Sequence, residues 1–110
     1  MLSYTAIECT KREVITMRLI DFNLSTADLQ QTLPLYWEVN RNELQPIQSV
    51  SLVHQQLVLV AASSGHPLTL DQFNMRTRQI NGQAQLYIQT EPQPLRLFGY
   101  RLSEQRLLFG

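Results

Sequence analysis

Cysteine and long apolar runs are almost absent from this 110-residue chain. The single cysteine, Cys9, rules out a disulfide framework and a Cys-x-x-Cys metal cluster within it. No segment approaches the ~20 consecutive apolar residues of a membrane-spanning helix. The first residues also lack the basic flank and apolar stretch of an export signal. We therefore expect a cytoplasmic protein without a membrane segment.

Glycine-rich and other familiar catalytic motifs are also missing. The four glycines are isolated from one another, so neither Gly-x-x-x-x-Gly-Lys nor Gly-x-Gly-x-x-Gly is present to hold a phosphate. The His-Glu-x-x-His and Gly-x-Ser-x-Gly patterns are absent as well. These absences argue against nucleotide-dependent catalysis, and we expect no cofactor, no metal and no catalytic residue.

An enzyme remains one alternative, because Cys9 paired with His54 or His66 would make a thiolate–imidazole nucleophile. Against it, Cys9 lies in a predicted strand, where a lone cysteine is usually a small buried hydrophobic residue. Each histidine lies at a predicted turn, and two histidines without a nearby group of carboxylates make a poor metal site.

Lysine is scarce, and the charges are distributed unevenly although the net charge is zero. Residues 1–73 carry four basic and seven acidic side chains, a net charge of −3, whereas residues 74–110 carry five arginines and two glutamates, a net charge of +3. Folding that brings the two halves together would cancel their opposite charges. Alternatively, the charge asymmetry would favour head-to-tail association of two chains, or an arginine-rich face that binds an anionic partner.

A repeated order of short patterns is the clearest positive signal, and it relates residues 4–39 to residues 48–90. The patterns are Leu-[Ser/Thr]-x-x-[Asp/Gln]-[Leu/Phe] at 24–29 and 68–73, and Leu-Tyr-apolar-[Glu/Gln] at 35–38 and 86–89. The first matches a helix capping box with a hydrophobic staple, and the second matches a half-buried strand. The repeat predicts helices that begin at Ser25 and Thr69, unless the similarity is a coincidence of common residue types.

The complete prediction is one α+β domain over residues 1–110: a mainly antiparallel sheet from two related ββαβ units and a C-terminal hairpin, packed against two helices. Pro34 should end the first helix near Thr32, and residues 44–47 should form a linker. Residues 57–62 are apolar on both faces and form the best candidate for a central strand. The expected strands are residues 4–9, 14–21, 35–39, 49–53, 57–62, 83–90, 95–102 and 105–109.

Residues 69–80 support two incompatible structures. As a helix, the segment has a cap at Thr69, apolar residues at helical spacing and Gly82 as a stop signal. As a strand, it would form a hairpin with residues 83–90 through Asn81-Gly82, a dipeptide typical of type I′ turns. We favour the helix, because the strand leaves the capping box without a role.

Arginine and aromatic side chains form the one group of residues whose chemistry suits ligand binding. Arginine donates paired hydrogen bonds to carboxylate or phosphate and stacks on planar groups. The scarcity of lysine, the zero net charge and the absence of RNP, KH or helix-turn-helix patterns argue against nucleic acid. The candidate residues for a small ligand or anion are Trp37, Arg76, Arg78, Tyr87, Arg96 and Arg101.

Unpaired strand edges suggest a use for the sheet. Residues 106–109 contain little that would block pairing with another strand, so edge-to-edge pairing predicts a homodimer. Our leading hypothesis is a non-catalytic, self-associating protein-interaction module, with regulation as one use. The second is a small-ligand or anion sensor with a pocket between helix and sheet near Trp37. The third is a small enzyme that uses Cys9 or the histidines.

Overall fold

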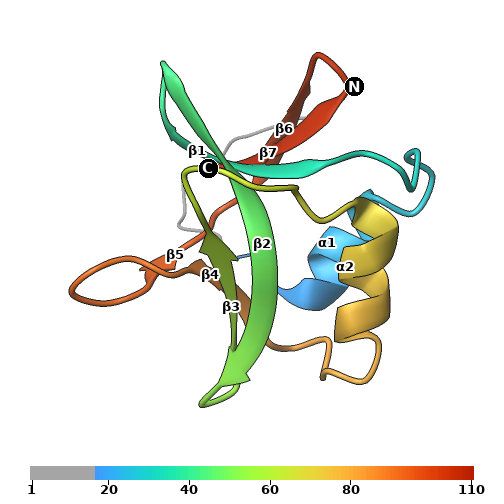
Figure 1. The fold of residues 1–110 in the computed structure, drawn as a ribbon. Coiled ribbons are helices and arrows are strands. Elements are labelled where there is room, and N and C mark those ends of the chain that lie inside the picture. The colour runs from blue at the N-terminus through green and yellow to red at the C-terminus, as the bar shows by residue number, and fades with distance from the viewer. Residues whose placement is uncertain (1–16) are drawn as a thin grey trace, which may run out of the picture.

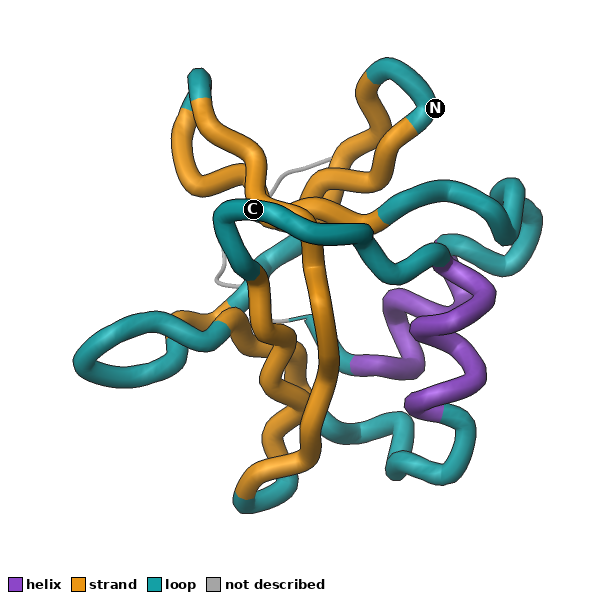
Figure 2. Tube along the Cα trace, viewed as in Figure 1, coloured by secondary structure: helices purple, strands orange, loops and turns teal. Residues whose placement is uncertain are grey.

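The computed structural model describes residues 17–110, which form two helices and seven strands (Figures 1 and 2). The helices are α1 (Leu19–Ser25) and α2 (Leu70–Thr77). The strands are β1 (Leu35–Asn40), β2 (Glu43–Val53), β3 (Gln56–Ala61), β4 (Gln85–Ile88), β5 (Leu95–Arg96), β6 (Tyr100–Ser103) and β7 (Arg106–Phe109). All seven strands belong to one mixed sheet in the order β5-β4-β3-β2-β1-β7-β6. The α+β class is therefore confirmed.

The two edge strands of the sheet, β5 and β6, follow each other directly in the chain, so the sheet curls until its edges meet. β5 pairs with β4, β6 pairs with β7, and only residues 97–99 separate them. β2 is bent in a similar way, because its first part pairs with β1 and its second part with β3, with a register shift between Ile47 and Ser49. With β5 and β6 taken as one bent strand, every strand has two neighbours and the sheet closes into a barrel.

The barrel is built from two copies of one arrangement. The first repeat (residues 19–61) contains α1, β1, β2 and β3, and the second repeat (residues 70–109) contains α2, β4, the bent β5–β6 segment and β7. The repeats join where β7 runs parallel to β1 and β3 runs parallel to β4. Equivalent residues pair at the two junctions: Leu35 with Leu107, Tyr36 with Leu108 and Trp37 with Phe109; Leu86 with Leu57, Tyr87 with Val58 and Ile88 with Leu59.

The two helices place the same residue types in the interior. Residues 19–26 are Leu-Ile-Asp-Phe-Asn-Leu-Ser-Thr, and residues 70–77, starting 51 positions later, are Leu-Asp-Gln-Phe-Asn-Met-Arg-Thr. The first leucine, the phenylalanine and the threonine of each segment are buried. Each threonine hydroxyl donates to the phenylalanine carbonyl four residues earlier, at 2.8 and 2.9 Å. The Phe22 and Phe73 rings meet edge to face with centroids 5.2 Å apart, so the helices contact each other through equivalent side chains.

Phe22 also connects the helices to the barrel. Its ring centroid lies 5.5 Å from that of Tyr100 and 5.4 Å from that of Phe109. In the first repeat, the pair that corresponds to Tyr100 and Phe109 is Val50 and Leu59. The second repeat therefore places two aromatic rings against Phe22, whereas the equivalent pair in the first repeat is aliphatic.

The first helix is not where the sequence predicted it. Ser25 is the last residue of α1 rather than its N-cap, and residues 26–28 form a turn. α1 begins after Arg18, whose backbone N–H and guanidinium both donate to the Asp21 carboxylate. The strand predicted for residues 14–21 is wrong at residues 19–21, because burial of Leu19 and Phe22 at helical spacing outweighs the β-branched residues that suggested a strand.

The second helix begins where its capping box predicted. The Gln72 backbone N–H donates to the Thr69 hydroxyl at 3.2 Å, and the Thr69 N–H donates to the Gln72 side chain at 3.0 Å. The alternative strand over residues 69–80 is wrong. Gly82 instead accepts a hydrogen bond from the Ile20 N–H at 2.9 Å. A Cβ at Gly82 would lie only 3.1 Å from that of Ile20, so the close approach favours glycine.

Most of the predicted strands between residues 35 and 109 are confirmed, with corrections at three places. β3 is an interior strand, as expected for residues 57–62. Residues 44–47 belong to β2 and are not a linker, and the segment 95–102 is divided between β5 and β6. Residues 106–109 are not an edge, because β7 lies between β1 and β6. The sheet is mixed rather than mainly antiparallel, because both junctions between the repeats are parallel.

The predicted repeat and the observed one differ in alignment. The helices correspond with an offset of 51 residues, whereas the capping patterns suggested an offset of 44. The strand predicted at 4–9, Cys9 and the turn after it lie outside the described residues, so the pair of ββαβ units stays a prediction. Within residues 17–110, no helix combines the length and the apolar character needed to cross a bilayer.

Candidate functional site

The residues predicted for a ligand site lie on separate parts of the molecule. Trp37 on β1 is half-buried and packs against the core. Tyr87 on β4 and Arg96 on β5 lie opposite each other in the strand register. They are brought together as a pair, but Trp37 faces the core at another strand.

Arg101 on β6 forms an ion pair that joins the two repeats. Its Nε and Nη2 donate to the two carboxylate oxygens of Glu38 on β1, at 3.0 and 2.7 Å. These hydrogen bonds lower the pKa of the Glu38 carboxyl below its ordinary value and raise the pKa of the Arg101 guanidinium. One of the five arginines in the basic half is therefore neutralised by the acidic half, as charge cancellation on folding predicts.

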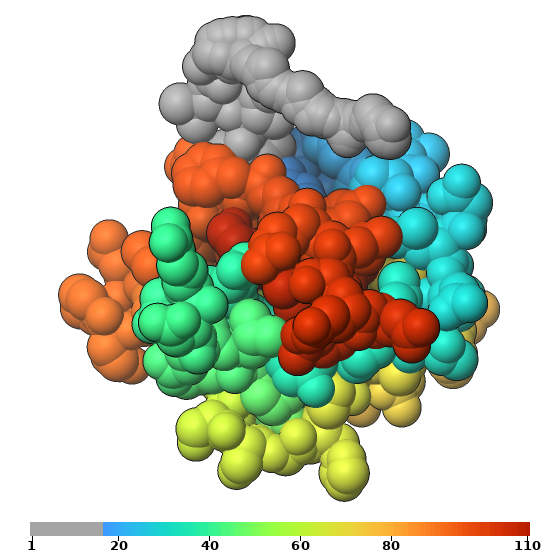
Figure 3. Space-filling view, turned by 90° about the horizontal axis from the view of Figure 1, so that it is seen from above, coloured from blue at the N-terminus to red at the C-terminus, as the bar shows by residue number. Residues whose placement is uncertain are grey.

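A shallow cleft of about 310 Å³ lies beside this ion pair. It is the hollow in Figure 3 where the dark red C-terminal end of the chain lies between green and orange segments. Because the Arg101 guanidinium is already paired with Glu38, the cleft offers an apolar wall more than a free cation. Its lining residues are Glu38, Phe98, Gly99, Tyr100, Arg101, Leu108 and Gly110.

The histidines do not meet a catalytic partner among the described residues. His54 is exposed in the turn between β2 and β3, with φ at 49°, and His66 is exposed in the loop before α2. Cys9 lies outside the described residues. Residues 17–110 contain no group of three or more histidine, cysteine or acidic side chains that could hold a metal ion.

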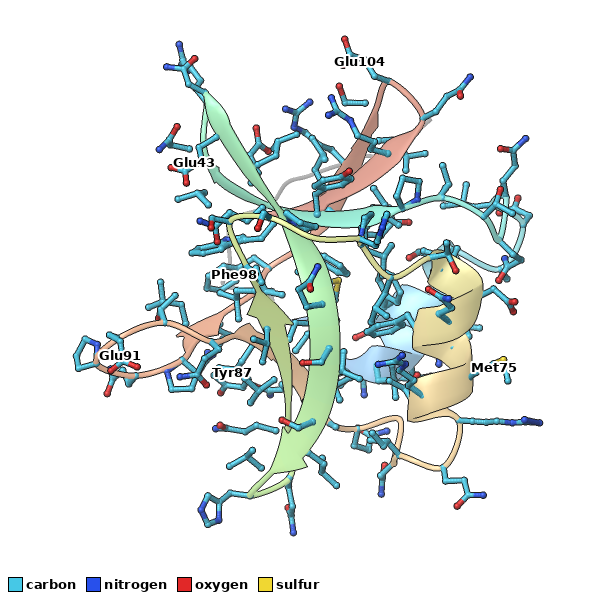
Figure 4. The ribbon with its side chains drawn as sticks, viewed as in Figure 1. Glu43, Met75, Tyr87, Glu91, Phe98 and Glu104 are labelled. Atoms are coloured by element: carbon cyan, nitrogen blue, oxygen red, sulfur yellow. The ribbon has the colours of Figure 1, made fainter. Side chains whose placement is uncertain are left out.

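The outer side of the two helices carries the most exposed apolar residues of the described part. Leu24 on α1 is 72% exposed and Met75 on α2 is 62% exposed, and the two occupy equivalent positions in the repeats. Figure 4 shows Met75 projecting away from the sheet. Ile20, one turn before Leu24, is 39% exposed. Each helix therefore exposes an apolar side chain that does not pack against the barrel.

A polar groove of about 400 Å³ runs between the helices. The amide of Asn74 donates to the side-chain oxygen of Gln31 at 3.0 Å across it. Asn23 and Asn74 are equivalent, as are Thr26 and Thr77, so both repeats contribute the same residue types to this groove. Its lining residues are Asn23, Thr26, Ala27, Gln31, Asn74, Thr77, Arg78 and Ile80.

The two helical segments have opposite net charge. Residues 18–28 contain Arg18, Asp21 and Asp28, a net charge of −1. Arg18 and Asp21 form an ion pair at 2.9 Å that lowers the pKa of the Asp21 carboxyl, which leaves Asp28 as the charge that this ion pair does not balance. Residues 69–79 contain Asp71, Arg76 and Arg78, a net charge of +1.

We define the helical face as the outward side of α1 and α2 with the turns that follow them. It contains Ile20, Leu24, Asp28, Asp71, Met75 and Arg78. All six are exposed. Arg78 was predicted as a ligand residue, and it both belongs to this face and lines the groove. Arg76 is exposed on the same helix.

The sequence prediction missed Leu24 and Met75 as surface residues. Leu24 was taken as the staple residue that precedes a helix at Ser25, which would have buried it. The pattern Leu-x-x-Phe-Asn-[Leu/Met]-x-Thr at 19–26 and 70–77 was the signal that would have found the pair, because in a helix it places Leu24 and Met75 opposite the buried phenylalanines.

The chain matches no protein-family model, and comparison with curated proteins and with solved structures finds no significant match. The function must therefore be argued from the molecule itself.

Proposed function

We propose that this protein is a non-catalytic, cytoplasmic, self-associating protein-interaction module that acts through its helical face. The observation that carries the proposal is the exposure of Leu24 and Met75 at equivalent positions of the two repeats. Edge-to-edge strand pairing is no longer the basis for association, because the barrel leaves β7 without a free edge. A different surface takes its place.

Burial of these side chains would provide the driving force. Removing a leucine or methionine side chain from water contributes about 1.5–3 kcal/mol, and association must also offset the loss of rigid-body freedom. The flanking polar residues and the opposite charges of the two helices limit how a partner can dock. A contact of this composition, an apolar centre with a charged rim, is typical of reversible protein–protein interfaces.

Sedimentation velocity over micromolar to near-millimolar protein concentrations tests the proposal. We expect the weight-average sedimentation coefficient to rise with concentration toward that of a dimer. Leu24→Glu and Met75→Glu should each abolish the rise, because both place a charge in the centre of the contact. Circular dichroism should show that the variants remain folded, since glutamate is a good helix former.

The chain provides a matched control in Leu52 and Leu102. These two leucines are also equivalent between the repeats and are 52% and 49% exposed, but they lie on the β2–β3 and β6–β7 hairpins. Leu52→Glu and Leu102→Glu should leave association unchanged. A monomer at every concentration, with no partner protein bound by the helical face, would contradict the proposed function.

A further inference from the structure

Three residues of α2 form a stripe along the helical face with opposite charges at its ends. Asp71, Met75 and Arg78 are spaced by four and then three residues, and Arg78 still has helical backbone angles, so all three lie on one side of the helix. All three are exposed. Within residues 17–110, neither the Asp71 carboxylate nor the Arg78 guanidinium forms an ion pair. The stripe therefore has a negative end, an apolar centre and a positive end.

The equivalent stripe of α1 is apolar throughout. It consists of Ile20 and Leu24 in the helix and Ala27 in the turn that follows, and all three are exposed. Ala27 and Arg78 both line the groove between the helices, so the two stripes border this groove from opposite sides. The helical face thus combines one stripe that carries charges at both ends with one that carries none.

The two helices run in opposite directions. The Asp71 N–H, at the start of α2, donates to the carbonyl of Gln31 in the segment after α1, at 2.9 Å. The Ile20 N–H, at the start of α1, donates to the carbonyl of Gly82 beyond the end of α2, at 2.9 Å. The start of each helix therefore lies beside the end of the other. A second copy that meets this face about a two-fold axis places each helix either against its own counterpart or against the other helix.

The charges favour contact of each helix with its own counterpart. A two-fold axis across the helices sets α2 antiparallel to α2 of the second copy, so Asp71 of each chain meets Arg78 of the other and the two Met75 side chains meet between them. The same axis sets the apolar stripe of α1 against itself. We propose, on the basis of the proposed function, that the helical face binds a second copy of this chain with α2 against α2 and α1 against α1.

The alternative, with α1 against α2, is unfavourable. A two-fold axis along the helices would bring Asp28, which follows Ala27, toward Asp71 of the other chain, and it would place Arg78 against the apolar Ile20. Like charges in a contact, and charges set against apolar side chains, both oppose binding. With like helices paired, Asp28 lies instead toward the start of α1 in the second copy. The pairing of like helices is therefore the one in which the two stripes are complementary to themselves.

The size of the face sets the strength of the dimer. Helices of 7 and 8 residues are only about 10–12 Å long at 1.5 Å per residue and about 10 Å wide. The area that the two helices cover is smaller than the ~800 Å² per partner of a standard stable interface. We therefore expect a weak and readily reversible dimer, with dissociation at micromolar or higher concentrations.

Charge reversal on α2, followed by sedimentation equilibrium, tests the pairing. Asp71→Arg alone puts like charges together at both contacts of the dimer, and so does Arg78→Asp alone. Each should raise the dissociation constant about tenfold or more, as expected when two surface attractions become repulsions. An equimolar mixture of the two single variants should associate nearly as the wild type does, because each contact between unlike chains again joins an acid to a base. The double variant should also recover, and high salt should reduce all these differences.

Two controls separate this effect from others. Asp71→Arg and Arg78→Asp both oppose the helix dipole, and the double variant carries both changes, so its recovery cannot come from a more stable helix. Glu91→Arg makes the same change in net charge as Asp71→Arg, but on the β4–β5 loop, which Figure 4 shows on the far side of the sheet from the helices. It should leave the dissociation constant unchanged.

The outcomes distinguish the pairing from the proposed function. If the single reversals do not weaken the dimer, or if their mixture does not recover, the pairing of like helices is wrong even though self-association stands. If the wild type is monomeric under all conditions, the proposed function fails together with the pairing. A dimer that responds equally to Glu91→Arg would show a net-charge effect and would also overturn the pairing.

Discussion

The two repeats have similar interiors and different surfaces. At the buried positions of the helices they carry identical residues: Leu19 and Leu70, Phe22 and Phe73, Thr26 and Thr77. At the strand junctions they again carry leucine twice, at Leu35 and Leu86 and at Leu57 and Leu107. Burial against the other repeat allows few alternatives at these sites, because each must fill the same space in a close-packed core.

At partly or fully exposed positions the repeats differ in charge. The second repeat has arginine at 76, 78, 101 and 106, and the first repeat has Ser25, Ala27, Ser51 and Gln56 at the equivalent positions. The charge asymmetry of the chain is therefore largely a difference between the surfaces of two similar units. It gives residues 18–28 a net charge of −1 and residues 69–79 a net charge of +1, whereas identical repeats would carry the same charge.

Truncation of the interior phenylalanines should give the largest difference between the repeats. Phe22→Ala and Phe73→Ala each remove a fully buried ring, and such changes cost about 3–5 kcal/mol in the free energy of unfolding. Phe22→Ala should cost more, because Phe22 contacts Tyr100 and Phe109 in addition to Phe73. Urea denaturation measures both values, and a larger loss for Phe73→Ala would contradict the aromatic–aliphatic contrast.

Helix capping should give the next difference. Thr69→Ala removes a side-chain cap and should cost about 1 kcal/mol of stability. Thr69→Ser, which keeps the hydroxyl, is the control and should be close to the wild type. Arg18→Ala at the equivalent position should cost less, because the Arg18 side chain does not accept from the first turn. Urea denaturation measures both losses in the free energy of unfolding. Equal losses would contradict the predicted difference between the two N-caps.

The two hairpin turns should respond alike to glycine. His54-Gln55 and Glu104-Gln105 all have positive φ values, from 49° to 66°, as a two-residue type I′ turn requires. Gln55→Gly and Gln105→Gly should each stabilise the protein by about 0.5–1 kcal/mol, because a non-glycine residue is strained there. Thermal melting with an Ala substitution at the same sites as control measures this, and destabilisation by glycine at either turn would be the opposite result.

The ion pair between the repeats should give the smallest effect, visible as a pH dependence. The pKa of Glu38 is lowered from its ordinary value of 4.5 in the folded protein. Its contribution to stability is therefore present above pH 4.5 and is lost as the pH falls through the folded pKa. Glu38→Gln should lower the melting temperature slightly at neutral pH and low salt, but not in acid. Glu43→Gln serves as the comparison, because the Glu43 carboxylate accepts from the Gln45 amide and not from an arginine. A difference for Glu38→Gln that persists in acid would exclude the ion pair as its cause.

The parts of the fold set by local patterns could be predicted, and the parts set by contact between the repeats could not. The Thr69–Gln72 box located α2, and alternation located β1 and the β2–β3 hairpin. The same box pattern at Ser25 was misleading, because the buried Leu19 and Phe22 place the N-cap at Arg18, seven residues earlier. The barrel closure, the parallel junctions and the exposed Leu24–Met75 pair depend on which faces the two repeats bury together, which no single segment reveals.

Disulfide trapping tests most directly whether the helical face of one copy binds another copy. In a Cys9→Ser background, one chain carries Leu24→Cys and a second chain, tagged to differ in mass, carries Met75→Cys. After mild oxidation of an equimolar mixture, we predict cross-linked dimers, because both positions lie in the proposed contact and a disulfide forms only where Cβ atoms approach within ~4 Å. No cross-link above that of a Leu52→Cys and Leu102→Cys mixture would contradict the account.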